Sequence, residues 1–245
     1  MFEKILNYLE KFQILILGAI LALGVICATH IVAGALPTDG ITVTGSASKV
    51  VQSDTATLEI SIISRNWTRK LCLSDIKNQM PTVIAYLKNN GIDEKDIDIK
   101  TTHGYFTYRY LPNGVSSNEV DHYNLYQPIT VKSNDVQKIK KISNDVTNLI
   151  NKGIDLDVSA PEYYYSKLSD LKVELLRDAT MDAKQRASAM LKSTNNRTGK
   201  IQSVRMGVFQ ITSANSTDVS DGGIYDTSSI EKKVTAVANV VFKIK

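Results

Sequence analysis

Side chains suited to redox or metal chemistry are scarce in this chain of 245 residues, which has 2 cysteines and 3 histidines. Cys27 falls in an apolar run, so Cys72 has no disulfide partner in the rest of the chain, and we expect it to be a small buried side chain. His103 and His122 can face each other across a predicted hairpin, with Asp121 beside one of them. No further ligand is spaced to complete a metal site, so we expect surface or edge-strand histidines.

Sequence motifs of well-known enzyme classes are also missing. The chain has no GxSxG, HExxH or CxxC motif and no glycine-rich phosphate loop, which are the signatures of common hydrolases, metalloproteases, redox proteins and nucleotide-binding proteins. We therefore predict a protein that is not an enzyme and that holds no cofactor.

Neither basic nor acidic residues are concentrated in one part of the sequence. The 29 basic and 25 acidic residues leave a net charge of +4, and no long run of either sign occurs. Binding to nucleic acid requires a concentrated basic face. We therefore expect no nucleic-acid partner.

The strongest positive signal is an apolar run from Phe12 to Leu36, which contains no Lys, Arg, Asp or Glu. A helix needs about 20 apolar residues to cross a bilayer. We therefore predict that residues 1–36 form an N-terminal transmembrane signal anchor, joined by a short linker at 37–40 to the rest of the chain. The lipid bilayer is then an expected partner.

The orientation of this anchor follows from the basic residues around it. Lys4 and Lys11 precede the apolar run, and the next basic residue is Lys49, so the N-terminus is expected in the cytoplasm. This predicts a single-pass inner-membrane protein with its C-terminal domain in the periplasm or outside. The alternative is a secreted or periplasmic protein cleaved near Ala35, because Ala33 and Ala35 have the small-x-small spacing of a signal-peptidase site.

Residues 41–245 are predicted to form one α+β domain, a largely antiparallel sheet with about three helices packed on it. Alternation from Thr55 to Ile62 indicates a half-buried strand, and apolar spacing predicts helices over 68–90, 135–152 and 168–196. In the last helix, Ala179, Ala183 and Ala187 form a smooth stripe that allows close packing on a sheet. Further strands are expected at 41–45, 46–54, 97–110, 122–131, 154–158, 200–212 and 234–244, with 97–110 and 122–131 forming a hairpin.

Two segments are candidates for contact with a ligand or a partner. One is the tyrosine run Tyr163, Tyr164 and Tyr165, whose rings either stack on a bound molecule or pack on the sheet. The other is the segment 213–229, rich in Ser, Asp and Gly, which we interpret as a mobile loop that contains Asp221 and Tyr225. A pocket beneath this loop would lie between the two segments.

Several short segments together resemble the SIMPL (DUF541) family of exported bacterial proteins, over roughly residues 40 to 245. The resemblance is carried by ITVTGSA at 41–47, DTA at 54–56, Leu87 with Gly91-Ile92, ATMDAKQRA at 179–187, Gly199 and Val204, and SSIEK at 228–232. The last of these is similar to the membrane-anchored branch. The resemblance implies an envelope protein of α+β fold without agreed catalytic residues. It also implies a link of some members to oxidative-stress tolerance and the formation of large homo-oligomers by others.

We therefore predict a non-enzymatic, membrane-anchored envelope protein that acts by self-assembly or partner binding, with a link to oxidative or envelope stress implied by the resemblance. Strand 234–244 is expected to be an edge strand that pairs with another chain, since free edges invite such pairing. The alternative is a ligand-binding or weakly catalytic module with a pocket near the 213–229 loop.

Overall fold

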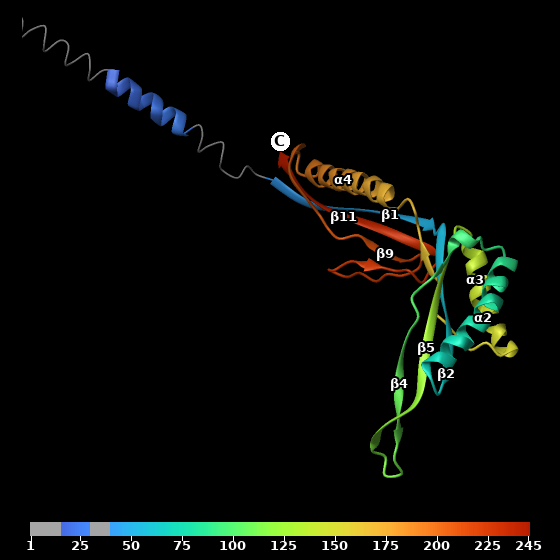
Figure 1. Cartoon of the computed structure of the whole chain (residues 1–245). Helices are drawn as coiled ribbons and strands as arrows, with labels where there is room; N and C mark the ends of the chain where they lie inside the picture. The colour runs from blue at the N-terminus through green and yellow to red at the C-terminus, as the bar shows by residue number, and fades with distance from the viewer. Residues whose placement is uncertain (1–15, 30–39) are drawn as a thin grey trace, which may run out of the picture. The chain divides into compact units, whose positions relative to one another are not determined.

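The computed structural model describes residues 16–29 and 40–245 (Figure 1). Within these residues the fold is a mixed α+β structure with four α-helices and two sheets whose strands are mostly antiparallel. The predicted class is therefore confirmed, although the strands form two sheets where we expected one.

The chain divides into two compact units. One comprises Met1–Val43, Lys184–Val204 and Val240–Lys245, and the other comprises Thr44–Ala183 and Arg205–Asn239.

The larger sheet has six strands in the order β3-β5-β2-β6, with β4 paired to β5 and β7 paired to β2. All of its strand pairs are antiparallel, and β2 and β5 form its centre with Ile60 opposite Ile129. The alternation predicted from Thr55 to Ile62 is confirmed by the burial of every second residue in β2. The strands are β2 (Thr55–Asn66), β3 (Ile97–Ile99), β4 (His103–Tyr110), β5 (Ser116–Ser133), β6 (Leu156–Val158) and β7 (Glu162–Tyr164).

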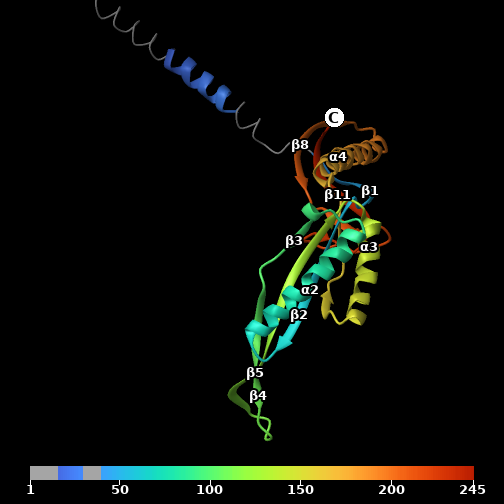
Figure 2. The same cartoon turned by 45° about the vertical axis from the view of Figure 1, so that its right-hand side comes forward.

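Helices α2 (Arg69–Asn89) and α3 (Val136–Asp145) cover one face of this sheet (Figures 1 and 2). The Thr68 hydroxyl accepts a hydrogen bond from the backbone N–H of Leu71 and caps the start of α2, which contains Pro81 as predicted. A 3-10 helix, Val146–Lys152, continues from α3. The core between helices and sheet consists mainly of Leu58, Ile60, Ile62, Ile76, Val83, Leu87, Ile129, Val131, Ile139 and Ile142.

The second sheet corrects our prediction of an edge strand at 234–244. Strand β11 (Glu231–Ile244) lies between its neighbours in the order β1-β11-β9-β10, and β8 also pairs with it. Its backbone groups are thus used within the chain, so the segment offers no free edge. The other strands are β1 (Gly40–Gln52), β8 (Thr198–Met206), β9 (Gln210–Ser213) and β10 (Ile224–Tyr225), of which β10 runs parallel to β9.

Helix α4 (Leu168–Lys192) confirms the predicted alanine stripe, since Ala179, Ala183 and Ala187 are all fully buried. Gly45 of β1 lies directly against two of them. A Cβ atom on Gly45 would stand 2.1 Å from the carbonyl oxygen of Ala179 and 2.4 Å from the backbone nitrogen of Ala183. Small side chains on both elements therefore allow strand and helix backbones to approach closely.

Only part of the predicted anchor falls in the described residues. Residues 16–29 form a helix with exposed side chains. Over 16–29 and 40–245, none of the helices has both the length and the hydropathy that crossing a membrane requires. The rest of the span from Phe12 to Leu36, most of the linker and the cleavage site near Ala35 lie outside the described residues, so the anchor stays a prediction.

Candidate functional site

Exposed apolar side chains of the second unit gather on a two-stranded arm, which we define as β4, the turn at 111–115 and residues 116–122 of β5. Pairing between β2 and β5 ends at Asn66 and Tyr123, so residues 116–122 have β4 as their strand partner. In both views the arm extends beyond β2 and α2 (Figures 1 and 2). The other edge of β4 has no strand partner in the part of the chain that the structure describes.

The arm is rich in aromatic and aliphatic side chains that face water. Tyr110 is 68% exposed, and six further apolar residues of the arm are also exposed: Tyr105, Phe106, Tyr108, Leu111, Val115 and Val120. Some of the rings order one another, because Phe106 and Tyr108 meet edge to face with centroids 5.1 Å apart. A two-stranded ribbon is only marginally stable in water, and such a contiguous apolar surface usually marks an interaction site.

Local sequence explains why the arm forms. Aromatic and β-branched residues favour the two strands, and Pro112-Asn113-Gly114 supplies the turn between them. The side-chain oxygen of Asn113 accepts from the backbone N–H of Val115 at 3.1 Å, and Gly114 has a φ of 79°. Leu111 and Val115 close the turn with a backbone hydrogen bond of 2.8 Å. The predicted hairpin is confirmed.

A pocket of about 380 Å³ lies at the predicted 213–229 loop, and we name it the β9–β10 pocket. Its walls are mostly apolar. The Lys172 ammonium of α4 lies 5.3 Å from the centre of the Phe209 ring and is the pocket's one cationic side chain. The complete lining is Lys172, Val208, Phe209, Ile211, Gly222, Gly223, Ile224 and Tyr225. Apolar walls with one cationic side chain suit a small anion that carries an apolar group.

The loop beside this pocket is held at both ends by buried polar side chains. Gln210 is buried, and its amide donates to the Ser220 carbonyl oxygen at 2.7 Å and accepts from the Ser220 backbone N–H at 3.3 Å. Near the other end, the buried Lys232 ammonium donates to the carbonyl oxygen of Asp226 at 2.6 Å. The segment that we interpreted as a mobile loop thus contains β10 and is tied to the sheet.

The structure brings the predicted tyrosine run next to the end of this loop. The backbone N–H of Tyr163 donates to the Thr227 carbonyl oxygen at 2.7 Å. The Tyr163 side chain is buried in the core, whereas the Tyr164 hydroxyl donates to Glu162 at 2.6 Å. This hydrogen bond, together with burial, raises the pKa of Tyr164. Tyr163 is therefore a packing residue.

The remaining predicted contact residues differ in their surroundings. Tyr225 is exposed and lines the β9–β10 pocket. Asp221 is exposed on the loop, next to pocket residue Gly222, and Tyr165 is half-buried. Sequence reasoning missed Lys172 and Phe209, because no local pattern links a helix residue to one 37 positions away.

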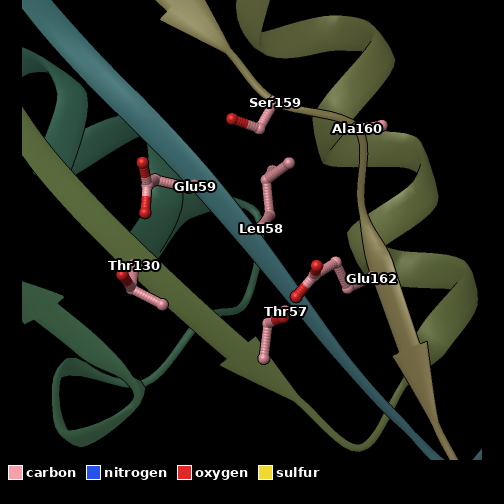
Figure 3. A pocket seen from close by; sticks show the side chains of 7 residues that line it. All are labelled: Thr57, Leu58, Glu59, Thr130, Ser159, Ala160 and Glu162. Atoms are coloured by element: carbon pink, nitrogen blue, oxygen red, sulfur yellow. The ribbon is translucent and has the colours of Figure 1, made fainter. Parts of the chain in front are cut away.

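A smaller polar cavity of about 210 Å³ lies on the face of β2 and β5 beside the segment between β6 and β7 (Figure 3). Glu59 and Glu162 both line it, together with Thr57, Leu58, Thr130, Ser159 and Ala160. Two carboxylates are too few to hold a metal firmly. Across residues 16–29 and 40–245, no group of three or more His, Cys, Asp or Glu side chains gathers at one point.

The histidines and the cysteine of the body occupy different surroundings. His103 pairs with Tyr126 and His122 pairs with Thr107, so the two residues are not opposite each other in the hairpin. His103 is exposed on an edge strand, as expected, but His122 is buried, which corrects our expectation of a surface residue. Cys72 is fully buried, as predicted, and its thiol donates to the Tyr123 carbonyl oxygen at 3.4 Å.

Comparison with protein families gives one match to this fold and sequence. Residues 41–242 match the family model SIMPL, described as a protein of unknown function (DUF541). Comparison with curated proteins gives no match.

Proposed function

The chain belongs to the SIMPL (DUF541) family, and on that premise we propose that it is a non-enzymatic envelope protein of the membrane-anchored branch, which assembles with further copies of itself through the β4–β5 arm. The run from Phe12 to Leu36 would anchor it in the inner membrane, with the domain on the outer side. The observation that carries the proposal is the exposed aromatic ribbon with one free strand edge.

The free edge of β4 supports a second copy of the chain as the partner. Unpaired backbone groups on an edge strand can extend a sheet across an interface. Two copies related by a two-fold axis would bring the same edge together, as in most homodimers. The charges on the arm partly offset each other, because Arg109 lies 3.5 Å from Glu119 and 3.8 Å from Asp121, which limits the repulsion between two arms.

Mass photometry of the full chain in mild detergent tests this proposal. We expect the wild-type chain to form oligomers, and we expect a chain in which Asn-Gly replaces residues 109–119 to be monomeric. This replacement joins Tyr108 to Val120, which are partners in the ladder, by a two-residue hairpin turn. The fold should therefore survive, which circular dichroism would check.

A matched point substitution separates the arm from the rest of the surface. Tyr110→Lys places a charge on the arm, and Val173→Lys places one on α4 at a residue of similar exposure, 69%. We expect only the first to weaken assembly. A wild-type chain that stays monomeric at every concentration, or an arm variant that assembles like the wild type, would count against the proposal.

A second candidate function, ligand binding, is favoured by the β9–β10 pocket at the segment where we expected one. Its aliphatic walls and the Lys172 ammonium would hold a short fatty carboxylate. Hexanoate should then raise the melting temperature of the wild-type chain, since ligands that bind the folded state stabilise it, and have little effect on Lys172→Gln. Equal shifts in both chains would remove the support for this function.

We also propose a link to oxidative or envelope stress, on the resemblance to exported SIMPL proteins. The burial of Cys72 and the hydrogen bond of its thiol make this cysteine a poor direct target for peroxide. Cells that depend on the protein for stress tolerance should therefore tolerate Cys72→Ser, and a loss of tolerance in that variant would point to thiol chemistry instead.

A further inference from the structure

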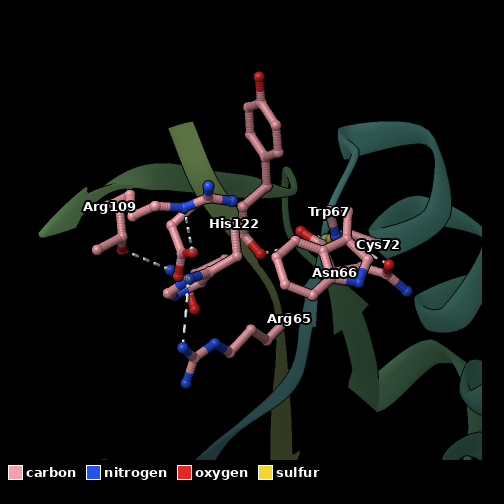
Figure 4. Close-up of polar contacts among 10 residues, drawn as sticks. Arg65, Asn66, Trp67, Cys72, Arg109 and His122 are labelled. Carbon is pink, nitrogen blue, oxygen red and sulfur yellow. Dashed lines mark hydrogen bonds and ion pairs between the residues drawn. The ribbon is translucent and has the colours of Figure 1, made fainter. Parts of the chain in front are cut away.

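A third cavity, of about 350 Å³, lies where the end of β2 meets β5. Its lining residues are Arg65 and Asn66 at the end of β2, Trp67 just before α2, and Asp121 and His122 of β5. Figure 4 labels four of them, Arg65, Asn66, Trp67 and His122, and marks the contacts among the residues drawn. We name this cavity the Arg65–Trp67 pocket.

Two polar groups, one from Asp121 and one from Arg65, approach the same nitrogen of His122 in this pocket. His122 is almost fully buried, and its Nδ1 lies 2.7 Å from Oδ2 of Asp121 and 3.2 Å from Nη2 of Arg65 (Figure 4). The hydrogen bond from His122 and the charges of Arg109 and Arg65 hold the pKa of Asp121 below its ordinary value. The carboxylate is therefore ionised and can only accept, so we assign the proton between these two groups to Nδ1 of His122.

This assignment leaves the Arg65 guanidinium beside a second donor. Because Nδ1 of His122 already donates to Asp121, the N–H of Arg65 cannot donate to the same nitrogen. Nη2 of Arg65 and the Nδ1–H of His122 are thus two donors 3.2 Å apart, and Oδ2 of Asp121 accepts the hydrogen bond from His122. An anionic oxygen of a ligand would give the Arg65 guanidinium an acceptor of its own.

The one carboxylate in the lining does not repel such an anion strongly. Asp121 accepts from His122, and its other oxygen lies 3.8 Å from Nε of Arg109. Arg109 also lies 3.5 Å from Glu119, so its charge is shared between two carboxylates. The cationic side chain that lines the pocket and can act on a ligand is Arg65.

Trp67 gives the pocket an apolar wall. It is the single tryptophan of the sequence and is 68% exposed, although a side chain of this size usually buries most of its surface. Its backbone is fixed, because its N–H donates to Oδ1 of Asn66 at 2.8 Å, and Nδ2 of Asn66 donates to Asp75 at 3.2 Å. The backbone that carries the indole is thus held in place before any ligand binds, which lowers part of the entropic cost of binding.

From this geometry we propose that the Arg65–Trp67 pocket binds a small organic carboxylate that carries a flat ring. The carboxylate bonds to the Arg65 guanidinium, and the ring lies against the Trp67 indole. The cavity volume is in the range of small-molecule sites. This proposal does not depend on self-assembly or on the β9–β10 pocket.

Tryptophan fluorescence of the full chain in mild detergent reads this site directly, because Trp67 is its sole tryptophan. Phenylacetate should change the emission in a saturable way, while phenylacetamide, which lacks the charge, and acetate, which lacks the ring, should bind at least about tenfold more weakly. No saturable change with phenylacetate, or equal binding of phenylacetamide, would overturn the proposal.

Variants test the two groups that hold the ligand. Arg65→Gln should weaken phenylacetate binding at least about tenfold, whereas Arg177→Gln removes a distant exposed arginine of α4 and should bind as the wild type does. Trp67→Leu, followed by ligand-observed NMR, should also bind more weakly. All three positions are exposed, and melting curves would check folding. Unchanged affinity in Arg65→Gln or in Trp67→Leu would refute the site.

Discussion

At Asp226, a largely buried carboxylate holds the end of the loop that carries Asp221 and Tyr225. Burial alone would raise the pKa of Asp226, but hydrogen bonds from Ser229 and Ser228 and the charge of Lys232 lower it from 3.8 to about 2. Because the folded state binds the proton less tightly than the unfolded state does, the ionised group stabilises the fold at neutral pH.

We predict that Asp226→Asn lowers the free energy of unfolding by about 2 kcal/mol at pH 7. The contribution of the ionised carboxylate is present in full well above pH 3.8 and is lost as the pH falls toward about 2, so the difference from the wild type should narrow over that interval. Urea unfolding at several pH values measures this difference in the free energy of unfolding. Asp221→Asn, on the exposed part of the same loop, should change the free energy by less than about 0.5 kcal/mol. A difference for Asp226→Asn that does not depend on pH would contradict this assignment.

The positions and contacts of single side chains were harder to predict from the sequence than the helices and strands were. For the run at 163–165 the sequence left ligand stacking and packing on the sheet as alternatives, and it could not tell that Tyr163 is buried in the core while Tyr164 bonds to Glu162. Arg65 and His122 are 57 positions apart. Their meeting depends on the register of β2 with β5, which no local pattern specifies.

At the scale of elements, the contact of Gly45 with α4 depends on the missing side chain. We predict that Gly45→Ala destabilises the chain by about 1–3 kcal/mol or more, because the added Cβ meets rigid backbone atoms that cannot move aside. Thermal unfolding tests this. Gly207→Ala is the matched control, since its Cβ would find its nearest neighbours at 3.5 Å, an ordinary contact. Equal melting temperatures of Gly45→Ala and the wild type would show that the helix can shift.

Helices and strands with a clear hydrophobic period were predicted correctly from the sequence. The order of the strands in the sheets was not. The alternation in β2 and the apolar spacing of α2 are local properties, and both elements were predicted from the sequence. The residue pattern of β11 alternates as that of an edge strand would, yet β11 lies between other strands of its sheet. Likewise, a Ser-, Asp- and Gly-rich composition indicates a mobile loop, and the buried Gln210 and Lys232 that tie it down lie outside that segment.

At the scale of the whole molecule, the predicted anchor would determine where the domain works. If the run from Phe12 to Leu36 is an uncleaved signal anchor, the mature protein keeps its N-terminal residues and stays with the membrane after alkaline carbonate extraction. We predict this outcome, because the apolar run is longer than the core of a signal peptide. N-terminal sequencing decides it, and a mature chain that begins at Leu36 would show cleavage and release.

The central claim, that copies of the chain meet through their arms, is tested most directly by site-specific photo-cross-linking in cells. A benzophenone amino acid would replace Tyr110 on the arm or, as the control, Val173 on α4, two residues of nearly equal exposure. We predict an adduct of twice the chain mass from position 110 and none from position 173. No chain-to-chain adduct from position 110, or one of equal yield from position 173, would contradict assembly through the arm.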